Sequence, residues 1–334
     1  MPLIPFNRRQ WLAAAATTAV FPALPAIAQP AASGVLILMV PQPAGNPTDA
    51  FARKLQPMLQ KDLGQAVVVE NVAGAGGAIG VAKTLRAPPS SPMLLLASQT
   101  ESILTPFARK DAPFQSEQLR PVALLSRGVY ALMARPDLPA TSLAELVSLA
   151  RERGANNKPL ALGHIGNGSM QHLMSERLAA RTKIPLTMVP YKGVSPVVQD
   201  LMGGQIDLAF MPMGGPIGDL LTSGKLKALG STGTAPTPKF PKVRPLAQQD
   251  KSLADFDYET WAGVFVAREA SEPLVGRLRQ ALSAALNDSG FQAFIVASGG
   301  ELVPAMTAAQ LDTFYQTEIR RYQQMSREIG VIPE

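Results

Sequence analysis

Short apolar runs recur along the chain and alternate with longer segments in which apolar residues return at helical spacing. The runs show little polar alternation, which is typical of strands buried on both faces of a parallel sheet. The predicted strands are residues 35–40, 66–70, 93–97, 122–125, 129–134, 160–163, 186–189, 206–210, 226–230 and 263–267.

The segments between these runs predict helices, and several begin with capping residues. Ser142, with Glu145 three positions later, indicates a capping box, and Ser195 indicates an N-cap followed by Pro196 at the first helical position. The predicted helices are residues 48–63, 78–85, 143–153, 169–181, 196–202, 216–222, 272–287 and 308–329. Alternating strands and helices predict an α/β fold.

The N-terminal segment has the pattern of a cleavable export signal. Arg8 and Arg9 precede an alanine-rich apolar stretch that ends in Ala-Ile-Ala at residues 26–28, so we expect cleavage before Gln29. The stretch is too short for a strong membrane anchor. The paired arginines favour a twin-arginine signal. We therefore expect a soluble, monomeric protein in the periplasm.

Composition excludes several classes of protein. Residues 1–28 contain two of the 31 basic residues and no acidic residue, which leaves 29 basic and 25 acidic residues and a net charge of +4. The basic residues are dispersed and form no stripe, which argues against a nucleic-acid partner. The chain has no cysteine, so neither disulfides nor a lipid attached to cysteine is available.

The remaining stretch of about 300 residues is long enough for two lobes. We interpret the predicted strands near residues 129–133 and 258–265 as crossings between the lobes. We therefore expect residues 29–130 and 260–334 to build one lobe and residues 131–259 to build the other. The proline-rich residues 235–245 read as an extended linker.

Two similar turns each connect a predicted strand to a predicted helix. Residues 45–48 read Gly-Asn-Pro-Thr and residues 166–169 read Gly-Asn-Gly-Ser. The hydroxyl and the free N–H groups of a first helical turn favour an anion, and open α/β sheets bind ligands at the carboxyl ends of strands. One such turn per lobe suits a dicarboxylate. The alternative is two ordinary turns, with Thr48 and Ser169 as simple N-caps.

The only histidines, His164 and His172, flank the second turn. A zinc site needs three or four ligands, and the chain has neither cysteine nor an H-E-x-x-H pattern, so no metal is expected. Ser169 is no nucleophile elbow, because residue 171 is Gln instead of Gly. We expect no catalytic residues and no cofactor. Ligand contact and structural support both stay open for the histidines.

The glycine-rich residues 74–80 follow a predicted strand and invite comparison with a dinucleotide fingerprint. The third glycine of G-x-G-x-x-G would fall on Ile79, and the nearest later acidic residue is Glu101. A tight turn into a helix is the better interpretation.

An ordered set of short motifs across residues 35–330 resembles the substrate-binding receptors of tripartite tricarboxylate transporters, the TctC or Bug-type proteins. The motifs include Gly-Asn-Pro-Thr-Asp at residues 45–49, Gly-Ala-Gly-Gly at 74–77, Gly-Asn-Gly-Ser at 166–169 and Val-Pro-Tyr-Lys-Gly at 189–193. The resemblance implies a two-lobe periplasmic binding protein of type II-like, Venus-flytrap form with two crossover strands. It also implies binding of small organic acids.

The resemblance and the two turns together give the expected ligand-binding residues. These are Pro43, Gly45, Asn46, Thr48, Asp49, Ser98, Gln99, His164, Gly166, Asn167, Gly168, Ser169, His172 and Met211. Asn46 replaces a family glycine, and Met211 stands where the family often has an acid that could face an amino group. An acid with an apolar or aromatic body is therefore favoured over a cationic amino acid.

We therefore expect a receptor that captures a small organic acid, either a dicarboxylate or an aromatic acid, and delivers it to membrane transporter subunits. Two alternatives remain. One is a periplasmic enzyme that acts on a carboxylate through His164 or His172, and the other is an adaptor that signals the bound ligand to a sensory partner.

Overall fold

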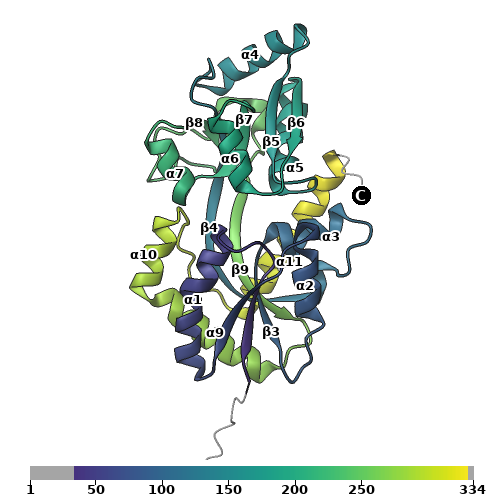
Figure 1. The fold of residues 1–334 in the computed structure, drawn as a ribbon, viewed down its shortest axis with the longest axis vertical. Coiled ribbons are helices and arrows are strands. Elements are labelled where there is room, and N and C mark those ends of the chain that lie inside the picture. Colours follow the sequence, from purple (N-terminus) through teal and green to yellow (C-terminus); the bar gives the residue numbers. More distant parts are fainter. Residues whose placement is uncertain (1–33, 330–334) are drawn as a thin grey trace, which may run out of the picture. The chain divides into compact units, whose positions relative to one another are not determined.

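A computed structural model of the chain describes residues 34–329. Strands form its centre and helices surround them, as Figure 1 shows. The strands are β1 (Leu36–Val40), β2 (Val67–Asn71), β3 (Met93–Ser98), β4 (Leu119–Ala134), β5 (Leu160–His164), β6 (Leu186–Pro190), β7 (Leu208–Pro212), β8 (Lys227–Ser231) and β9 (Glu259–Ala267). The predicted α/β class is confirmed.

The strands pair in the order β2-β1-β3-β9-β4-β7-β5-β6, with β8 paired to β4. We call β2, β1, β3, β9 and the first part of β4 the first sheet, and the last part of β4 with β5 to β8 the second sheet. β1 is parallel to β2 and β3, and β5 is parallel to β6 and β7. Each sheet therefore has a parallel core whose strands end at one edge.

Strand β4 belongs to both sheets. Its residues up to Val129 pair with β9, and its residues from Tyr130 onward pair with β7. Residues 122–125 and 129–134, predicted as separate strands, are two parts of this one 16-residue strand. The strand is buried along most of its length and continues through Arg127 and Gly128.

The helices occupy the segments between the strands. They are α1 (Pro47–Leu63), α2 (Ala78–Leu85), α3 (Thr105–Ala108), α4 (Leu143–Ala155), α5 (Met170–Thr182), α6 (Val194–Met202), α7 (Gly215–Thr222), α8 (Leu246–Gln249), α9 (Glu272–Asn287), α10 (Ser289–Ala297) and α11 (Ala308–Ile329). Short turns η1 (Ala75–Gly77), η2 (Thr100–Leu104), η3 (Ser116–Gln118) and η4 (Lys251–Leu253) complete the set.

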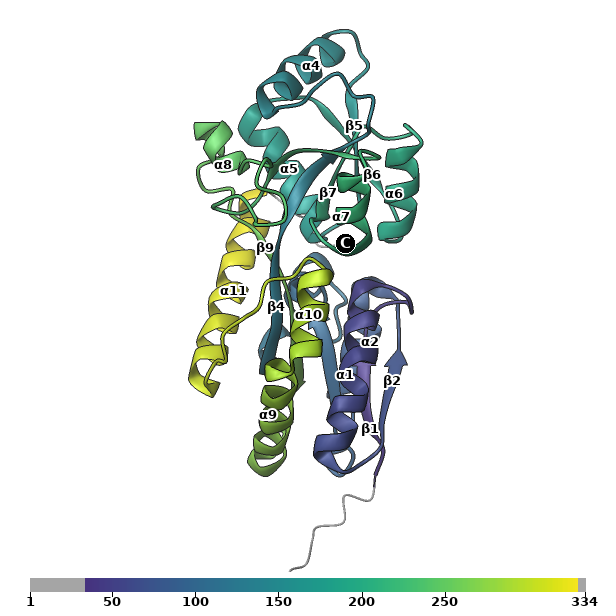
Figure 2. The ribbon, with the colours of Figure 1, turned by 90° about the vertical axis from the view of Figure 1, so that its left-hand side faces the viewer.

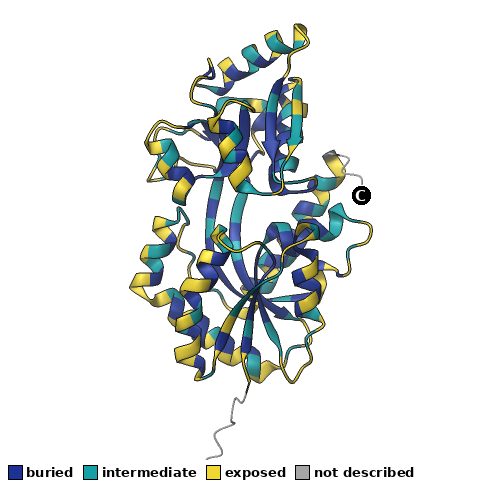
Figure 3. Ribbon diagram, viewed as in Figure 1, coloured by how far each residue is buried: buried dark blue, intermediate teal, exposed yellow. Residues whose placement is uncertain are grey.

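Apolar side chains cover both faces of the first sheet. Leu55 and Leu59 of α1 and Leu278 of α9 share one buried cluster with β1. Tyr315 and Tyr322 of α11 belong to the cluster on the other face. Figure 2 shows α11 on the opposite side of β4 from α10, and Figure 3 shows the buried strands inside the more exposed helices. Burial on both faces explains the continuous apolar runs of the sequence.

Some predicted boundaries were wrong for identifiable reasons. Helix α6 begins at Val194 after Gly193, two residues earlier than the Ser195–Pro196 signal indicated. The strand predicted at residues 206–210 is shifted toward Pro212, because Asp207 is used in side-chain bonds to Arg135 and the Ala161 N–H. The capping role of Ser142 is confirmed.

Helix α10 was missed, although Asp288 caps it by accepting a hydrogen bond from the Phe291 N–H at 2.8 Å. Residues 235–245 contain no helix or named strand, in agreement with a linker. The predicted export signal lies outside the described residues. Among those described, no helix is long and apolar enough to span a membrane.

The predicted boundaries of the lobes stay a prediction, although they correspond closely to the two sheets. The C-terminal helix α11 was assigned to the first lobe, yet it contacts α5 as well as β4 and η2. Helix α11 therefore links the two sheets through its own contacts, in addition to the link through β4.

Candidate functional site

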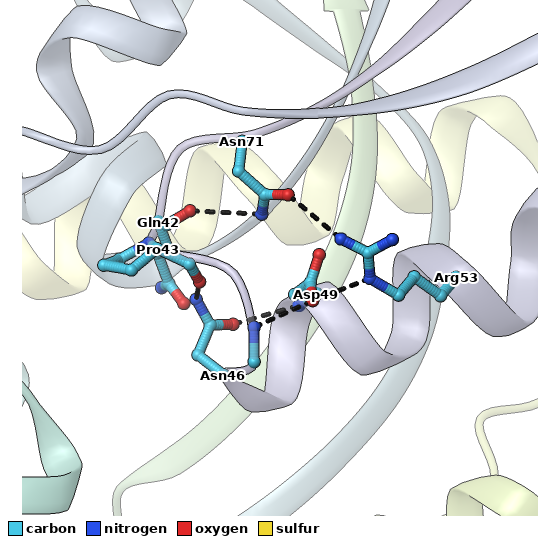
Figure 4. A network of polar contacts seen from close by, with 7 residues as sticks. Gln42, Pro43, Asn46, Asp49, Arg53 and Asn71 are labelled. Atoms are coloured by element: carbon cyan, nitrogen blue, oxygen red, sulfur yellow. Dashed lines mark hydrogen bonds and ion pairs between the residues drawn. The ribbon is translucent and has the colours of Figure 1, made fainter.

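The first predicted turn connects β1 to α1 and is held by its own side chains (Figure 4). The Asn46 side-chain oxygen accepts the Asp49 N–H at 2.9 Å, and the Asn46 amide donates to the Pro43 carbonyl. Asn46 is therefore the N-cap of α1, and Thr48, predicted as the cap, lies half-buried in the first helical turn. Space is open beside Gly45, since no atom lies within 4 Å of where its Cβ would be.

Asp49 anchors this turn from the inside. Only 2% of it is exposed, and one carboxylate oxygen accepts the Gly45 N–H at 2.8 Å and the Arg53 Nε–H at 2.9 Å. Burial tends to raise the pKa of Asp49, but hydrogen bonds from Arg53, the Gly45 N–H and Asn71 bring this pKa below its ordinary value. These contacts assign Asp49 to the support of the turn instead of ligand contact.

A buried glutamate that was not among the predicted site residues ties this turn to the end of β3. Glu101 accepts hydrogen bonds from the Ser98 N–H at 2.9 Å, from the Ser98 hydroxyl at 2.7 Å and from the Gln42 amide. The Asn71 amide donates to the Gln42 carbonyl at 3.2 Å. The only sequence signal was an acidic residue beside a predicted strand end. Ser98 lies at the site's edge, with its hydroxyl proton directed to Glu101.

Gln99 has a different place from the one predicted. Its side chain is fully buried and donates to the Tyr130 hydroxyl at 3.2 Å and to the Glu259 carbonyl at 3.0 Å, while it accepts the Trp261 N–H at 3.3 Å. Burial raises the pKa of Tyr130 to about 12, which reflects the same dry surroundings. Gln99 thus joins η2 to β4 and β9, and its amide group bonds to the protein itself.

The second predicted turn connects β5 to α5. Gly166 and Gly168 have φ of +117° and +74°, which residues with a Cβ rarely adopt. The Ser169 hydroxyl accepts the His172 N–H at 3.2 Å, so the predicted capping role of Ser169 is confirmed. No atom lies within 4 Å of the position of a Gly166 Cβ, and Asn167 is exposed. Open space therefore adjoins the backbone of this turn too.

Both histidine rings hydrogen-bond to this turn. His164 Nδ1 lies 3.0 Å from the Gly166 carbonyl, and the Gly168 N–H donates to His172 Nδ1 at 3.1 Å. A carbonyl only accepts, so His164 carries a proton on Nδ1; an N–H only donates, so His172 carries none there. His172 Nε2 lies 3.6 Å from Glu176. The rings support the turn.

The two rings lie in contact with centroids 4.5 Å apart and planes tilted by 31°, and His164 is only 1% exposed. Burial lowers the pKa of His164, and the neighbouring His172 lowers it further. A neutral His164 fits the tautomer given by its bond to Gly166.

The second turn also contacts an element that follows β3. A Cβ on Gly168 would lie 2.2 Å from the Cβ of Ala108 in α3. Because α3 follows η2, which Glu101 joins to the first turn, an unbroken series of contacts links the two turns across the two sheets. The structure therefore brings the carboxyl ends of β1, β3 and β5 to one region.

Met211 is the predicted residue that lies apart from this region. Its side chain is 1% exposed and belongs to the apolar cluster of the second sheet, with Val197 and Leu201 of α6 and Ile217 of α7. The prediction placed Met211 beside the ligand, but packing under α6 and α7 gives it a core position instead.

The chemistry of the region suits an anion. In α1, Pro47 has no N–H and the Asp49 N–H is bonded to Asn46; in α5, the His172 N–H is bonded to Ser169. The first turns offer their remaining N–H groups and the positive ends of two helix dipoles. Among the described residues, no cluster of three or more His, Asp or Glu could hold a metal ion. Hollows of about 360 and 400 Å³ lie elsewhere, beside Arg277 and beside Arg127. Their lining residues belong to neither turn.

Known proteins match this chain over most of its length. Residues 51–331 match the model of the tripartite tricarboxylate transporter family receptor. BugT of Bordetella pertussis is 31% identical over 297 residues, which are 88% of each chain. The structure of MatC from Rhodopseudomonas palustris with bound malate matches with a TM-score of 0.77 and 27% identity, over 87% of this chain and 98% of MatC.

The periplasmic binding protein BugD matches equally well, with a TM-score of 0.77 and 27% identity over 89% of this chain and 98% of BugD. These similarities include both sheets, so the predicted two-lobe fold of a periplasmic binding protein is confirmed. The chain belongs to the receptors of the tripartite tricarboxylate transporter family.

Proposed function

We propose that this protein is a periplasmic receptor that binds a small organic acid between its two turns and delivers it to a tripartite transporter in the membrane. The observation that carries the proposal is the pair of capped helix N-termini, at Asn46 and Ser169, joined across the sheets by the Gly168–Ala108 contact. Membership of a receptor family supports transport over other uses of such a site.

The ligand that fits best is a dicarboxylate. Two separate turns, each with helix N–H groups and open space beside Gly45 or Gly166, suit an acid with an anionic group at each end. MatC, a related receptor, was solved with malate, which has this form. An aromatic body was favoured because Met211 was expected beside the ligand, and Met211 is instead buried in the core of the second sheet.

Helix dipoles alone do not explain the binding. A helix N-terminus stabilises an anion by about 0.3–2 kcal/mol, whereas micromolar affinity requires about 8 kcal/mol. Direct hydrogen bonds from the backbone of both turns and exclusion of water between the sheets supply the difference. This requirement favours a ligand that engages both turns together.

An enzyme that uses His164 or His172 has less support. Both rings bond to the backbone of the second turn through Nδ1, and His164 is almost fully buried. These contacts account for both residues without proton transfer to a substrate. No contact among residues 34–329 favours an adaptor in signalling over a transport receptor.

A thermal-shift screen of residues 29–334 tests the proposal. The panel contains mono-, di- and tricarboxylates, aromatic acids and amino acids. A ligand at 100 times its dissociation constant adds about 2.7 kcal/mol, which raises the midpoint by several degrees. We expect the largest rise with a dicarboxylate and an unchanged ligand after incubation. A rise with amino acids alone, or turnover of the ligand, would contradict the proposal.

Absence of any shift has two explanations that a second measurement separates. Mass spectrometry of the supernatant after denaturation detects an acid that was already bound during purification. A co-purified dicarboxylate would support the proposal. An empty supernatant together with no shift would refute it.

A further inference from the structure

Two glycines, one in the loop after β7 and one in the loop after α10, meet backbone to backbone. Gly214 directly precedes α7, and Gly299 follows α10. A Cβ on Gly214 would lie 2.2 Å from the Ser298 carbonyl oxygen and 2.3 Å from the Gly299 Cα, and a Cβ on Gly299 would lie 1.9 Å from the Gly214 Cα. Non-bonded atoms do not approach this closely, so neither position has room for a side chain.

The contact lies beside the point where β4 passes from the first sheet to the second. The Met213 N–H donates to the Val129 carbonyl at 3.2 Å, which holds the loop after β7 on this strand. Glu301 holds the loop after α10 two residues away, because it exchanges backbone hydrogen bonds with Arg127 at 3.3 and 2.6 Å. Both partners of the glycine contact are thus fixed to adjacent points of one strand.

The ends of two helices meet at this contact. Gly214 is the N-cap of α7, and Ser298 is the C-cap of α10; Figures 1 and 2 both show these helix ends facing one another. The amino end of a helix carries a partial positive charge and the carboxyl end a partial negative charge. The contact is therefore electrostatically favourable as well as close.

We propose that the Gly214–Gly299 contact is the stop that sets how far the two sheets close toward each other. A side chain at Gly214 acts as a wedge between the loops. Since the contact adjoins the crossing point of β4, a small separation there produces a larger one at the more distant turns after β1 and β5. The expected effect on ligand affinity rests on the proposed function, but the separation of the two sheets can be measured without a ligand.

Gly214 allows a clean test of the wedge. Its φ of −136° and ψ of 177° suit any residue, so Gly214→Ala and Gly214→Val add volume without backbone strain. Gly193 provides the matched control. It is likewise a glycine N-cap, of α6, with extended backbone at φ 163° and ψ −179°, and nothing lies within 4 Å of its Cβ position.

The distance between the sheets can be measured with spin labels. The chain has no cysteine, so Lys54→Cys on α1 and Glu152→Cys on α4 create the only two labelling sites, both at exposed positions. Double electron–electron resonance then gives the distribution of distances between these labels in each variant. Circular dichroism and thermal midpoints establish that each variant is folded.

We expect the label distance to change from the parent to Gly214→Ala and further to Gly214→Val, while Gly193→Ala and Gly193→Val leave it unchanged. Affinity for an acid found in the screen falls roughly tenfold in Gly214→Ala, in line with the usual effect of overpacking. If folded Gly214→Ala has the same distribution of label distances as the parent, the glycine contact does not act as a stop. If no acid binds the parent, the proposed function fails, and the label distances still decide the stop.

Discussion

At the scale of single residues, the polar side chains of the two turns mostly face the protein instead of the space beside the turns. Asp49, His164 and Ser169 are all at most 5% exposed, and each bonds to the backbone of its own turn. Their proposed role is to hold backbone N–H groups in place. Substitutions should therefore change stability and ligand affinity together.

Replacement of Asp49 by Asn should lower the free energy of unfolding by about 1.5–3 kcal/mol, because hydrogen bonds to a buried charged group are lost. Urea unfolding at pH 7 measures the change. Asp62→Asn is the control, since Asp62 is an exposed acid of the same helix. Equal effects of the two substitutions would show that Asp49 does not anchor the turn.

Acid should weaken the second turn through His164. The pKa of His164 is lowered in the folded state, so the unfolded chain binds more protons near neutral pH. The resulting stability is complete above the unfolded pKa of about 6.5 and is lost as pH falls through the lower folded value. Unfolding free energies measured between pH 7.5 and 5.5 should decrease by at most about 1.36 kcal/mol per pH unit from this group.

His164→Asn is the matching variant, because an amide can donate to the Gly166 carbonyl without titrating. It should reduce the slope of stability against pH in this range. An unchanged slope would show that His164 is not the group responsible.

At the scale of elements, the N-terminal caps of helices link folding to binding. Ser169 caps α5 at 3.2 Å beside the second turn, and Ser142 caps α4 at 3.3 Å away from both turns. Ser169→Ala and Ser142→Ala should each lower stability by about 1 kcal/mol. Only Ser169→Ala should also weaken acid binding, as titration calorimetry can establish. Weakening by both variants would mean that binding follows general stability.

Elements of the fold were predictable where local pattern and packing agree. The apolar runs gave the strands because both sheet faces are buried, and helix α9 has the predicted bounds. Pattern failed where a long-range contact decides the boundary. The run from Leu119 to Ala134 is one strand because β9 and β7 pair with successive parts of it, and no local signal shows this.

The candidate site shows the same division. The turns after β1 and β5 were predictable from glycine and capping residues, and both lie at carboxyl ends of strands. The burial of Gln99 and the tie from Glu101 to Gln42 depend on contacts between segments far apart in the chain. Met211 was expected beside the ligand, and its core position depends on packing with α6 and α7, which no local pattern indicates.

At the scale of the whole molecule, we expect two turns on separate sheets to act on one ligand. Neither helix N-terminus alone provides enough free energy for tight binding. Affinity should therefore depend on both ends of the acid, and mutations in one turn should not be compensated by the other.

The most direct measurement is isothermal titration calorimetry of residues 29–334 with the best dicarboxylate from the screen and with its monoamide. The two ligands have nearly the same size and differ in the charge at one end. If both turns bind an anionic group, the monoamide should bind at least about tenfold more weakly, a difference of about 1.4 kcal/mol. Equal affinities would contradict recognition of the acid by both turns.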